Sequence, residues 1–316
     1  MPSILFVKTS SLGDVVHNAP AVSDLRRALP GAAIDWVVEE SFVEVARLHG
    51  AVRRVIPVAV RRWRTRLYDP ATWRELSAFR NTLCAERYER VIDTQGLVKS
   101  ALIAAAARGN KHGFDAHSAR EPLAAKFYDV RHAVPLALHA VERNRRLACA
   151  ALDLAVEGPA DYGFARPAET GRLGENPAVV FLTMTSRADK LWPEAHWRSL
   201  LAWLASRGQN CLLPWESETE RARCDRIAAG FAQARVPERL TIARLASLLR
   251  QAPAVVGVDT GLTHLAAGLG APTAGIYCST DLALTGLYGA ARARNVGALG
   301  ASPSVDEVRA VLEAWL

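Results

Sequence analysis

The chain has 316 residues, half of them apolar and 22% charged, which excludes a disordered or fibrous protein and favours two domains. The net charge of +7 comes from the first half, since residues 1–150 hold 23 Lys and Arg against 15 Asp and Glu, whereas residues 151–316 hold 16 against 17. We therefore expect the first half to bind an anionic partner, which could be phosphate-rich lipid, nucleic acid or an acidic sugar.

The sequence shows no signal of export or membrane insertion. The N-terminal apolar run is too short for a signal peptide, and no stretch approaches the roughly 18 apolar residues of a membrane span. The five cysteines are scattered singly, at Cys84, Cys149, Cys211, Cys224 and Cys278. Their spacing fits neither a disulfide framework nor a zinc site, so we expect reduced thiols and a cytoplasmic protein.

Short apolar runs alternate with longer amphipathic stretches along both halves. In the first half we predict strands at 4–7, 34–38, 55–58 and 91–93, and helices at 19–29, 42–48, 72–86 and 99–107. In the second half we predict strands at 178–183, 210–214, 255–259 and 273–277, and helices at 194–205, 218–229, 242–249, 263–269 and 305–316. This alternation is typical of parallel sheets with helices on both faces, an α/β fold.

The polar stretch 157–177, rich in glycine and proline, is the predicted linker. It separates domains expected at 1–160 and 161–316, with a ligand bound in the cleft between two similar halves. Pro20 is expected in the first turn of its helix, where its missing N–H costs little.

The first strand leads into the turn V-K-T-S-S-L-G-D at residues 7–14. The turn lacks the spaced glycines of a dinucleotide site, which argues against an NAD-dependent oxidoreductase. Asp14 follows Gly13 where the strand ends. It either caps the following helix or acts as a general base, since an ordinary carboxylate has a pKa of about 4 and is ionised at neutral pH.

The segment 53–66, R-R-V-I-P-V-A-V-R-R-W-R-T-R, holds six arginines and no acidic residue. Such a run is usually a solvated surface, but without a compensating acid it repels itself. Arginine binds phosphate and carboxylate groups through two parallel hydrogen bonds. A second basic group is expected from Lys111, Arg120 and Lys126. Nucleic acid stays open as a ligand, although Trp63 is the only aromatic residue within the run and no stacking platform or recognition fold is evident.

Three polar stretches follow predicted strands of the second half. T-M-T-S-R-A-D-K-L-W at 183–192 offers hydroxyls, Arg187 and Lys190 to phosphate, or is an ordinary polar loop. E-S-E-T-E at 216–220 could bind ribose hydroxyls, or could only favour a helix dipole. V-V-G-V-D-T-G-L-T-H-L at 255–265 predicts an anion site at a helix start, or a simple capped turn in which His264 is a satisfied half-buried side chain.

Taken together and in order, V-K-T-S-S-L-G-D-V-V-H, T-S-R-A-D-K-L-W-P-E and V-D-T-G-L-T-H-L-A resemble the heptosyltransferase I group of glycosyltransferase family 9. R-R-W-R and S-A-R-E-P-L-A extend the resemblance over nearly the whole chain. It implies a GT-B fold, with two Rossmann-like doubly wound domains facing across a cleft and the last helix packing back towards the first domain. It also implies inverting transfer of L-glycero-D-manno-heptose from ADP-heptose to Kdo of Kdo2-lipid A, or to a different acceptor or from another nucleotide sugar.

The resemblance also implies roles for individual residues. Asp14 would be the catalytic base. The donor would be held by Thr185, Ser186, Lys190, Glu218, Asp259, Thr260, Gly261, Leu262, Thr263 and His264, and the acceptor by Ser10, Arg61, Arg62, Arg64 and Arg120. The family's usual glycine after P-W is replaced here by P-W-E-S-E, so Glu216 and Glu220 compete with Glu218 for the ribose.

The family often carries a further cation at the position after Arg64. That position is Thr65 here, and Arg66 is the nearest substitute. The resemblance implies no metal, cofactor or nucleic acid. It implies a monomer on the cytoplasmic side, peripheral to the inner face of the inner membrane.

Overall fold

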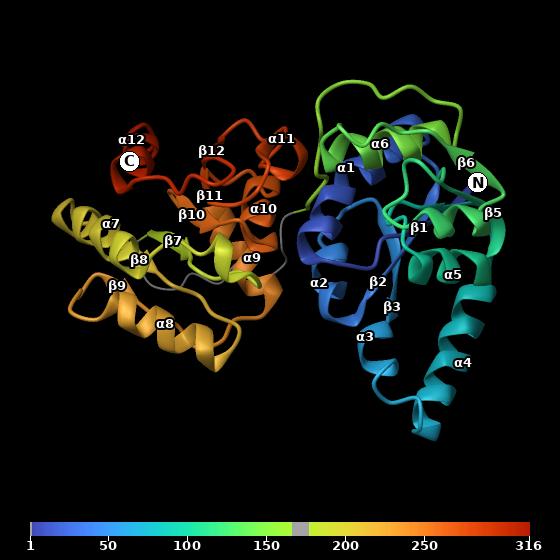
Figure 1. Cartoon of the computed structure of the whole chain (residues 1–316), viewed down its shortest axis with the longest axis horizontal. Helices are drawn as coiled ribbons and strands as arrows, with labels where there is room; N and C mark the ends of the chain where they lie inside the picture. Colours follow the sequence, from blue (N-terminus) through green and yellow to red (C-terminus); the bar gives the residue numbers. More distant parts are fainter. Residues whose placement is uncertain (1, 166–176) are drawn as a thin grey trace. The chain divides into compact units, whose positions relative to one another are not determined.

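The computed structural model describes residues 2–165 and 177–316. The chain divides into two compact units, residues 1–165 and 166–316 (Figure 1). The first unit extends past residue 160 because the chain there returns to it: Gly50 N donates to Gly163 O at 3.0 Å, and Ala165 N donates to Leu48 O at 2.8 Å. Residues 166–176 of the predicted linker lie outside the described residues.

The first unit contains a six-stranded sheet with every neighbouring pair parallel and the order β3-β2-β1-β4-β5-β6. The strands are β1 (Ser3–Val7), β2 (Ala33–Glu39), β3 (Val52–Val58), β4 (Arg87–Asp93), β5 (Arg108–Phe114) and β6 (Val130–His132). Val7 at the end of β1 aligns with Val37 of β2 and with Asp93 of β4, so these carboxyl ends are level. The central strands are buried on both faces, as in parallel sheets generally.

Helices cover both faces of this sheet. They are α1 (Leu12–Ala28), α2 (Val43–Arg47), α3 (Val60–Trp63), α4 (Pro70–Cys84), α5 (Val98–Ala106) and α6 (Ala140–Ala150), with short 3₁₀ turns η1 (Glu40–Phe42) and η2 (Pro122–Phe127). α4 and α5 pack Leu83 and Ile103 onto Leu5 and Val7 of β1, whereas α1 and α6 pack together on the other face (Figure 1).

The second unit repeats this plan. Its strands, β7 (Ala178–Leu182), β8 (Asn210–Leu212), β9 (Ala234–Arg235), β10 (Val255–Val258), β11 (Thr273–Tyr277) and β12 (Ala293–Gly297), are all parallel and lie in the order β12-β11-β10-β7-β8-β9. Its helices are α7 (Glu194–Ser206), α8 (Glu218–Ala228), α9 (Ile242–Gln251), α10 (Gly261–Gly268), α11 (Leu282–Thr285) and α12 (Val305–Glu313), with the 3₁₀ turn η3 (Ala188–Lys190). Counted along the chain, both sheets have the strand order 3-2-1-4-5-6 of doubly wound folds.

One apolar cluster fills the face of the second sheet that α7, α8 and α12 cover. It contains Trp192 and Trp197, whose ring centroids lie 5.1 Å apart at an interplanar angle of 86°. Val308 and Leu312 of α12 are fully buried in the same cluster. The last helix thus packs within its own unit, and its expected packing towards the first domain stays a prediction.

All eight predicted strands are confirmed to within a few residues, but four strands were missed. β9 has only two residues, and β5 reads R-G-N-K-H-G-F, so polar side chains interrupt its apolar pattern. The expected position of Pro20 is wrong. α1 begins at Leu12, because the Asp14 carboxylate accepts a hydrogen bond from the Ser11 N–H at 2.8 Å, and Pro20 therefore lies in the helix interior.

A buried ion pair ties α1 to α6. Arg145 Nε and Nη2 donate to the two carboxylate oxygens of Asp24 at 2.7 and 3.1 Å, and both side chains are at most 4% exposed. Arg145 Nη2 also donates to Glu157 O and Gly158 O, each at 3.0 Å. One guanidinium thus holds two helices and the segment that leaves them.

We expect Arg145→Met to lower the free energy of unfolding by about 3–5 kcal/mol, because it leaves the buried Asp24 with only the half-exposed Arg27, whose Nη1 lies 3.3 Å away. Urea denaturation followed by circular dichroism measures the loss. Arg309→Met is the control, since Arg309 pairs with the 85% exposed Asp306 and its removal should cost at most about 1 kcal/mol. Equal losses in the two variants would contradict this role for Arg145.

Candidate functional site

Each sheet has one topological switch point, where the connections between its strands change direction. It lies between β1 and β4 in the first unit and between β7 and β10 in the second. In doubly wound folds the loops that leave the carboxyl ends of two such strands diverge, and ligands bind there. The turn at 7–14 follows β1, and the stretches at 183–192 and 259–264 follow β7 and β10. The sequence-predicted polar loops therefore stand at the switch points of their sheets.

In the second unit, Asp259 is the centre of this arrangement. Its carboxylate accepts hydrogen bonds from Lys190 Nζ at 2.6 Å and from Thr280 Oγ1 at 2.5 Å. His264 Nε2 lies 3.6 Å from the other carboxylate oxygen. Asp259 is only 7% exposed, so these groups and the protein, rather than bulk water, set its electrostatics.

Burial by itself would raise the pKa of Asp259. The nearby His264, the hydrogen bonds from Lys190 and Thr280 and the charge of Lys190 outweigh burial and hold the pKa well below its usual range. Asp259 is therefore a carboxylate at neutral pH, and Lys190 is fixed beside it. Thr280 was missed in the sequence; the signal was the polar C-S-T that directly follows the predicted strand 273–277.

The start of α10 is built around the same turn. Thr260 is its N-cap residue, and Gly261 and Leu262 open the helix with part of their surface exposed. Thr185 Oγ1 donates to Asp259 O at 2.9 Å, which joins the β7 loop to the β10 loop. The first N–H groups of a helix have no partner within it, and together with the helix dipole they favour an anion.

Thr263 has a structural role in this turn. It is fully buried, and its hydroxyl donates to Val258 O at 2.7 Å. A Cβ at position 257 would come within 2.1 Å of the Thr263 Oγ1, so Gly257 makes this close approach possible. The hydroxyl of Thr263 is therefore not free for a sugar nucleotide, and its N–H already donates to Thr260 O at 3.1 Å.

The remaining predicted donor residues lie at the edge of this group. Ser186 is exposed on the β7 loop. Glu218 opens α8 with its side chain 80% exposed and 3.8 Å from Arg221. Glu216 pairs with Arg239, and the Glu220 carboxylate accepts the Glu216 N–H at 2.7 Å. Among the three acidic residues of the stretch, Glu218 is the most open to a ligand.

In the first unit, Asp14 occupies the first turn of α1. Arg120 Nη2 and Nη1 donate to its two oxygens at 2.6 and 3.3 Å, and Ser11 N donates at 2.8 Å. Its side chain is 14% exposed, and that of Arg120 is 43% exposed. The N-cap residue of α1 is Ser11, so the expectation that Asp14 itself caps the helix is wrong: Asp14 lies in the first turn and accepts the N–H of the cap residue. Asp14 is also part of an ion pair that spans 106 positions of the chain.

Lys8 is a buried cation close to this ion pair. Its Nζ donates to Thr94 O at 2.8 Å and to Asn144 Oδ1 at 3.3 Å. Burial lowers the pKa of Lys8 to about 8, against the opposing effect of the Asp14 charge. Burial would raise the pKa of Asp14, but Lys8, Arg120 and the Ser11 N–H outweigh it, so that pKa lies well below its usual range.

Other side chains complete a basic group around the opening turn. Lys99 Nζ donates to the Ser10 hydroxyl at 3.1 Å, and Gln95 Oε1 accepts the Ser10 N–H at 3.2 Å. Arg143 lies over the Phe114 ring at 4.8 Å, and burial together with the Arg120 charge lowers its pKa. Lys99, Gln95 and Arg143 were missed, because only folding brings β4, α5 and α6 to the end of β1.

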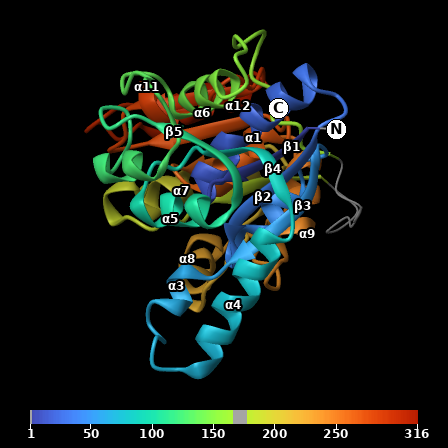
Figure 2. The same ribbon diagram turned by 90° about the vertical axis from the view of Figure 1, so that its right-hand side faces the viewer.

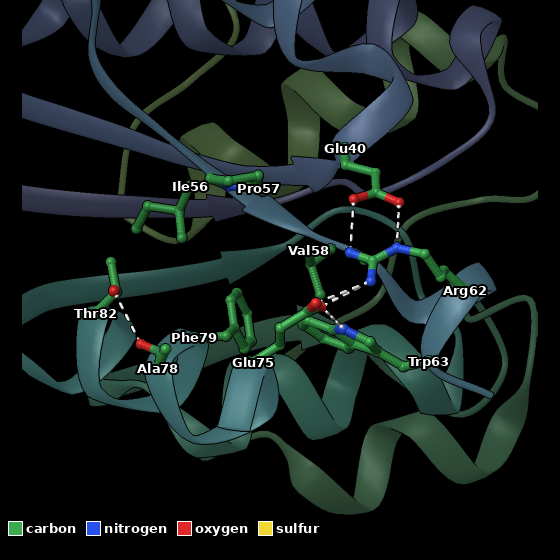
Figure 3. Close-up of a pocket in the computed structure, with 11 residues that line it drawn as sticks. Glu40, Ile56, Pro57, Val58, Arg62, Trp63, Glu75, Ala78, Phe79 and Thr82 are labelled. Atoms are coloured by element: carbon green, nitrogen blue, oxygen red, sulfur yellow. Dashed lines mark hydrogen bonds and ion pairs between the residues drawn. The ribbon is translucent and has the colours of Figure 1, made fainter. Parts of the chain in front are cut away.

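The arginine-rich segment is compensated by acids from elsewhere in the chain, contrary to expectation. Arg53 and Arg54 both bind the fully buried Asp35 of β2, at 2.9 and 2.8 Å. Arg62 donates to both oxygens of Glu40 and to Glu75 of α4 (Figure 3). These partners lie 13 to 22 positions from the arginines they bind, so the run itself did not reveal them.

Arg62 also borders a pocket of about 270 Å³ between β3, α3 and α4 (Figure 3). The Trp63 indole N–H donates to Glu75 at 2.7 Å on its wall. Arg61 and Arg64 differ from Arg62 in being exposed, and the Arg61 guanidinium lies over the Phe42 ring at 5.4 Å. Of the three predicted acceptor arginines on this segment, Arg61 and Arg64 are the ones open to an anion.

The part of the chain that the structure describes shows neither a metal-binding cluster nor a membrane-spanning helix. No group of three or more His, Cys, Asp or Glu side chains is arranged to hold a metal ion among residues 2–165 and 177–316. Within the same residues, no helix has the length and apolar character needed to cross a membrane. The five cysteines are free thiols, as predicted.

Comparisons with known proteins give one consistent result. The model of glycosyltransferase family 9 (heptosyltransferase) matches residues 76–314. Lipopolysaccharide heptosyltransferase 1 of Escherichia coli (strain K12) is 45% identical over 294 residues, which cover 90% of this chain and 91% of that protein.

Two solved structures of E. coli heptosyltransferase WaaC are similar over the whole chain. The one with ADP superposes with a TM-score of 0.91 at 41% identity and covers 99% of this chain and 100% of that one. The one with ADP-2-deoxy-2-fluoro heptose gives 0.90 at 42% identity, with 99% of each chain covered. The predicted fold class, two Rossmann-like doubly wound units of the GT-B type, is confirmed.

The lowered pKa of Lys8 has a consequence for stability. An unfolded chain keeps this lysine protonated up to about pH 10.5, whereas the folded chain releases the proton near pH 8. Between these values the unfolded state binds more protons, so the free energy of unfolding should rise with pH by up to about 1.4 kcal/mol per unit. Lys8→Met removes this titration.

We therefore expect the stability of the native protein, relative to Lys8→Met, to increase as the pH rises from 8 to 10. Urea denaturation at matched ionic strength measures both curves, and the subtraction cancels the tyrosines that titrate in the same range. Curves that run parallel would show that Lys8 is not a desolvated cation.

Proposed function

Because the chain belongs to glycosyltransferase family 9, the heptosyltransferases, we propose that it transfers L-glycero-D-manno-heptose from ADP-heptose to Kdo of Kdo2-lipid A. The observation that carries the proposal is the second unit's switch point, where Lys190, Asp259 and the start of α10 lie together and would suit an anionic sugar nucleotide. The similarity to heptosyltransferase structures with ADP and with a fluorinated ADP-heptose supports it.

The donor would lie on the second unit. The diphosphate would contact Lys190, the Ser186 hydroxyl and the backbone at Thr260 to His264, where the helix dipole favours negative charge. The Thr185 hydroxyl would join them only by giving up its bond to Asp259 O. Asp259, kept ionised by its partners, would accept hydrogen bonds from heptose hydroxyls. Glu218 would bind the ribose, since its carboxylate is the most exposed of its stretch.

The acceptor would bind the first unit, in the basic group around Asp14. Kdo carries a carboxylate, and lipid A carries phosphates, which match Arg120 and the exposed Arg61 and Arg64. Ser10, whose hydroxyl accepts a hydrogen bond from Lys99, would contact the sugar. Arg62 would position α3 through Glu40 and Glu75 and could reach the acceptor only by giving up these bonds.

Asp14 would be the general base, but Lys8 and the ion-pair partner Arg120 hold its pKa well below its usual range, which disfavours proton transfer. An anionic acceptor that draws the exposed Arg120 guanidinium to its own carboxylate would remove this ion pair. The pKa of Asp14 would then rise, since burial favours the neutral acid. Binding of the acceptor would thus activate the base.

In the reaction, Asp14 would take the proton of a Kdo hydroxyl while the oxygen of that hydroxyl attacks the anomeric carbon of heptose. The bond between that carbon and the diphosphate oxygen breaks, ADP leaves, and the configuration at the carbon inverts. Lys190 and the start of α10 would stabilise the charge that develops on the diphosphate. A lysine and a helix dipole would here take the part that a cation could otherwise play.

The lipid acceptor also bears on location. We place the protein on the cytoplasmic side, peripheral to the inner face of the inner membrane, with the exposed arginines of the first unit facing anionic lipid. We also predict that the protein is a monomer and that it binds no nucleic acid.

The direct test supplies ADP-heptose and a Kdo-bearing lipid A acceptor and follows ADP release together with product mass. The proposal expects stoichiometric ADP and one added heptose. A family member with another donor or acceptor is the alternative, and it would consume a different nucleotide sugar or leave Kdo2-lipid A unmodified.

We expect Asp14→Asn to lower kcat by a factor of about 10² to 10⁴, because the amide keeps the helix-start hydrogen bond but cannot accept the proton. The Kd for ADP should stay within about twofold, measured by calorimetry. Glu307→Gln is the matched control, since the Glu307 carboxylate accepts the Ser304 N–H at 2.7 Å at the start of α12 as Asp14 does at α1. Near-normal turnover of Asp14→Asn would sink the base assignment.

A further inference from the structure

The loop that joins α3 to α4 carries an unusual set of exposed side chains. We call residues 64–74, R-T-R-L-Y-D-P-A-T-W-R, the α3–α4 tip. Leu67 is 53% exposed, Tyr68 85% and Trp73 60%. Among the described residues nine large apolar side chains are exposed, and the only two aromatic ones are in this tip. The tip projects away from the sheet of the first unit (Figures 1 and 2).

The polar groups of the α3–α4 tip are largely satisfied within it. The Trp73 indole N–H donates to Leu67 O at 2.9 Å, so the exposed ring needs no water partner. Asp69 accepts the Ala71 N–H at 2.8 Å and donates its own N–H to Arg66 O at 3.0 Å. Moving such a loop into a less polar medium costs little, because few unpaired hydrogen-bonding groups lose their water.

The charges of the tip are mostly positive, three arginines against one acid. Arg64, Arg66 and Arg74 are exposed, and Asp69, the single acid, caps α4. Tyr and Trp favour the boundary between headgroups and acyl chains, and arginine keeps its guanidinium among phosphates while its stem packs on apolar groups. A loop that exposes apolar and aromatic side chains together with several arginines therefore complements an anionic bilayer surface.

We propose that the α3–α4 tip is an interfacial anchor that inserts Leu67, Tyr68 and Trp73 into the headgroup region of an anionic lipid bilayer. The anchor rests on the proposed function only for its purpose, which is to bring α3 and its acceptor arginines to a lipid-borne sugar. It differs from attraction by exposed arginines alone in having an apolar part that salt does not screen.

The test measures binding of the full chain to vesicles of phosphatidylethanolamine and phosphatidylglycerol that contain no acceptor. Leu67→Ser combined with Tyr68→Ser and Trp73→Ser should weaken binding at least tenfold, and the binding that survives about 0.5 M salt should disappear. Arg66→Gln with Arg74→Gln should weaken it by about 25-fold at low salt, from roughly fivefold for each arginine. Leu102→Ser with Leu136→Ser is the matched control, because these leucines are 52% and 56% exposed outside the tip.

Insertion has its own spectroscopic signature. Vesicles with brominated acyl chains should quench part of the tryptophan emission, and that part should be absent in Trp73→Phe, which keeps an apolar ring. This readout stands even if the triple variant fails to fold. Transfer to a water-soluble Kdo acceptor should be equal in the native protein and the triple variant.

Three outcomes would overturn the anchor. These are native protein that ignores acceptor-free vesicles, a triple variant that binds them as well as the native protein, and a native dimer that the triple variant abolishes in the absence of vesicle binding. The last would make the tip a contact between copies. If the native protein binds vesicles and the triple variant does not, but the native protein transfers no heptose, the anchor stands and the proposed function is refuted.

Discussion

A doubly wound parallel sheet leaves one place where the loops after two adjacent strands diverge, and this constraint organises both units of the protein. In each unit a carboxylate stands at that place and a cation holds it: Lys190 holds Asp259, and Arg120 holds Asp14. A buried carboxylate is costly unless it is paired, so the ion pairs follow from the position of the acids. Both carboxylates are therefore ionised at neutral pH in the protein without ligand.

The two switch points share a topology but offer different chemistry. The second unit presents a helix start of small residues, with the Thr263 hydroxyl and Gly257 shaping the turn so that backbone N–H groups are available. The first unit presents long cationic side chains gathered from three other elements around a short turn. The helix start of the second unit suits a compact diphosphate. The cationic side chains of the first unit suit an acceptor with several dispersed anionic groups.

How much the sequence revealed depended on separation along the chain. The cluster around Asp259 was predictable because the motifs at 183–192 and 255–265 directly follow or contain an apolar strand, and adjacent parallel strands bring such ends together. The bond between Arg120 and Asp14 joins residues from distant elements, and no local pattern predicts it. The arginines at 53–66 misled for the same reason, since Asp35 and Glu75, which bind them, lie outside the run. Strand β9 was too short for a periodicity to show.

The division of roles between the two units requires that the second unit alone bind the nucleotide, although both units have the same strand order. Hydrogen–deuterium exchange of the full chain with and without saturating ADP measures where the nucleotide lies. We expect slower exchange at 185–190 and 259–268, with residues 8–16 unchanged. Protection at 8–16 without protection at 259–268 would place the nucleotide on the first unit and contradict the division of roles between Asp259 and Asp14.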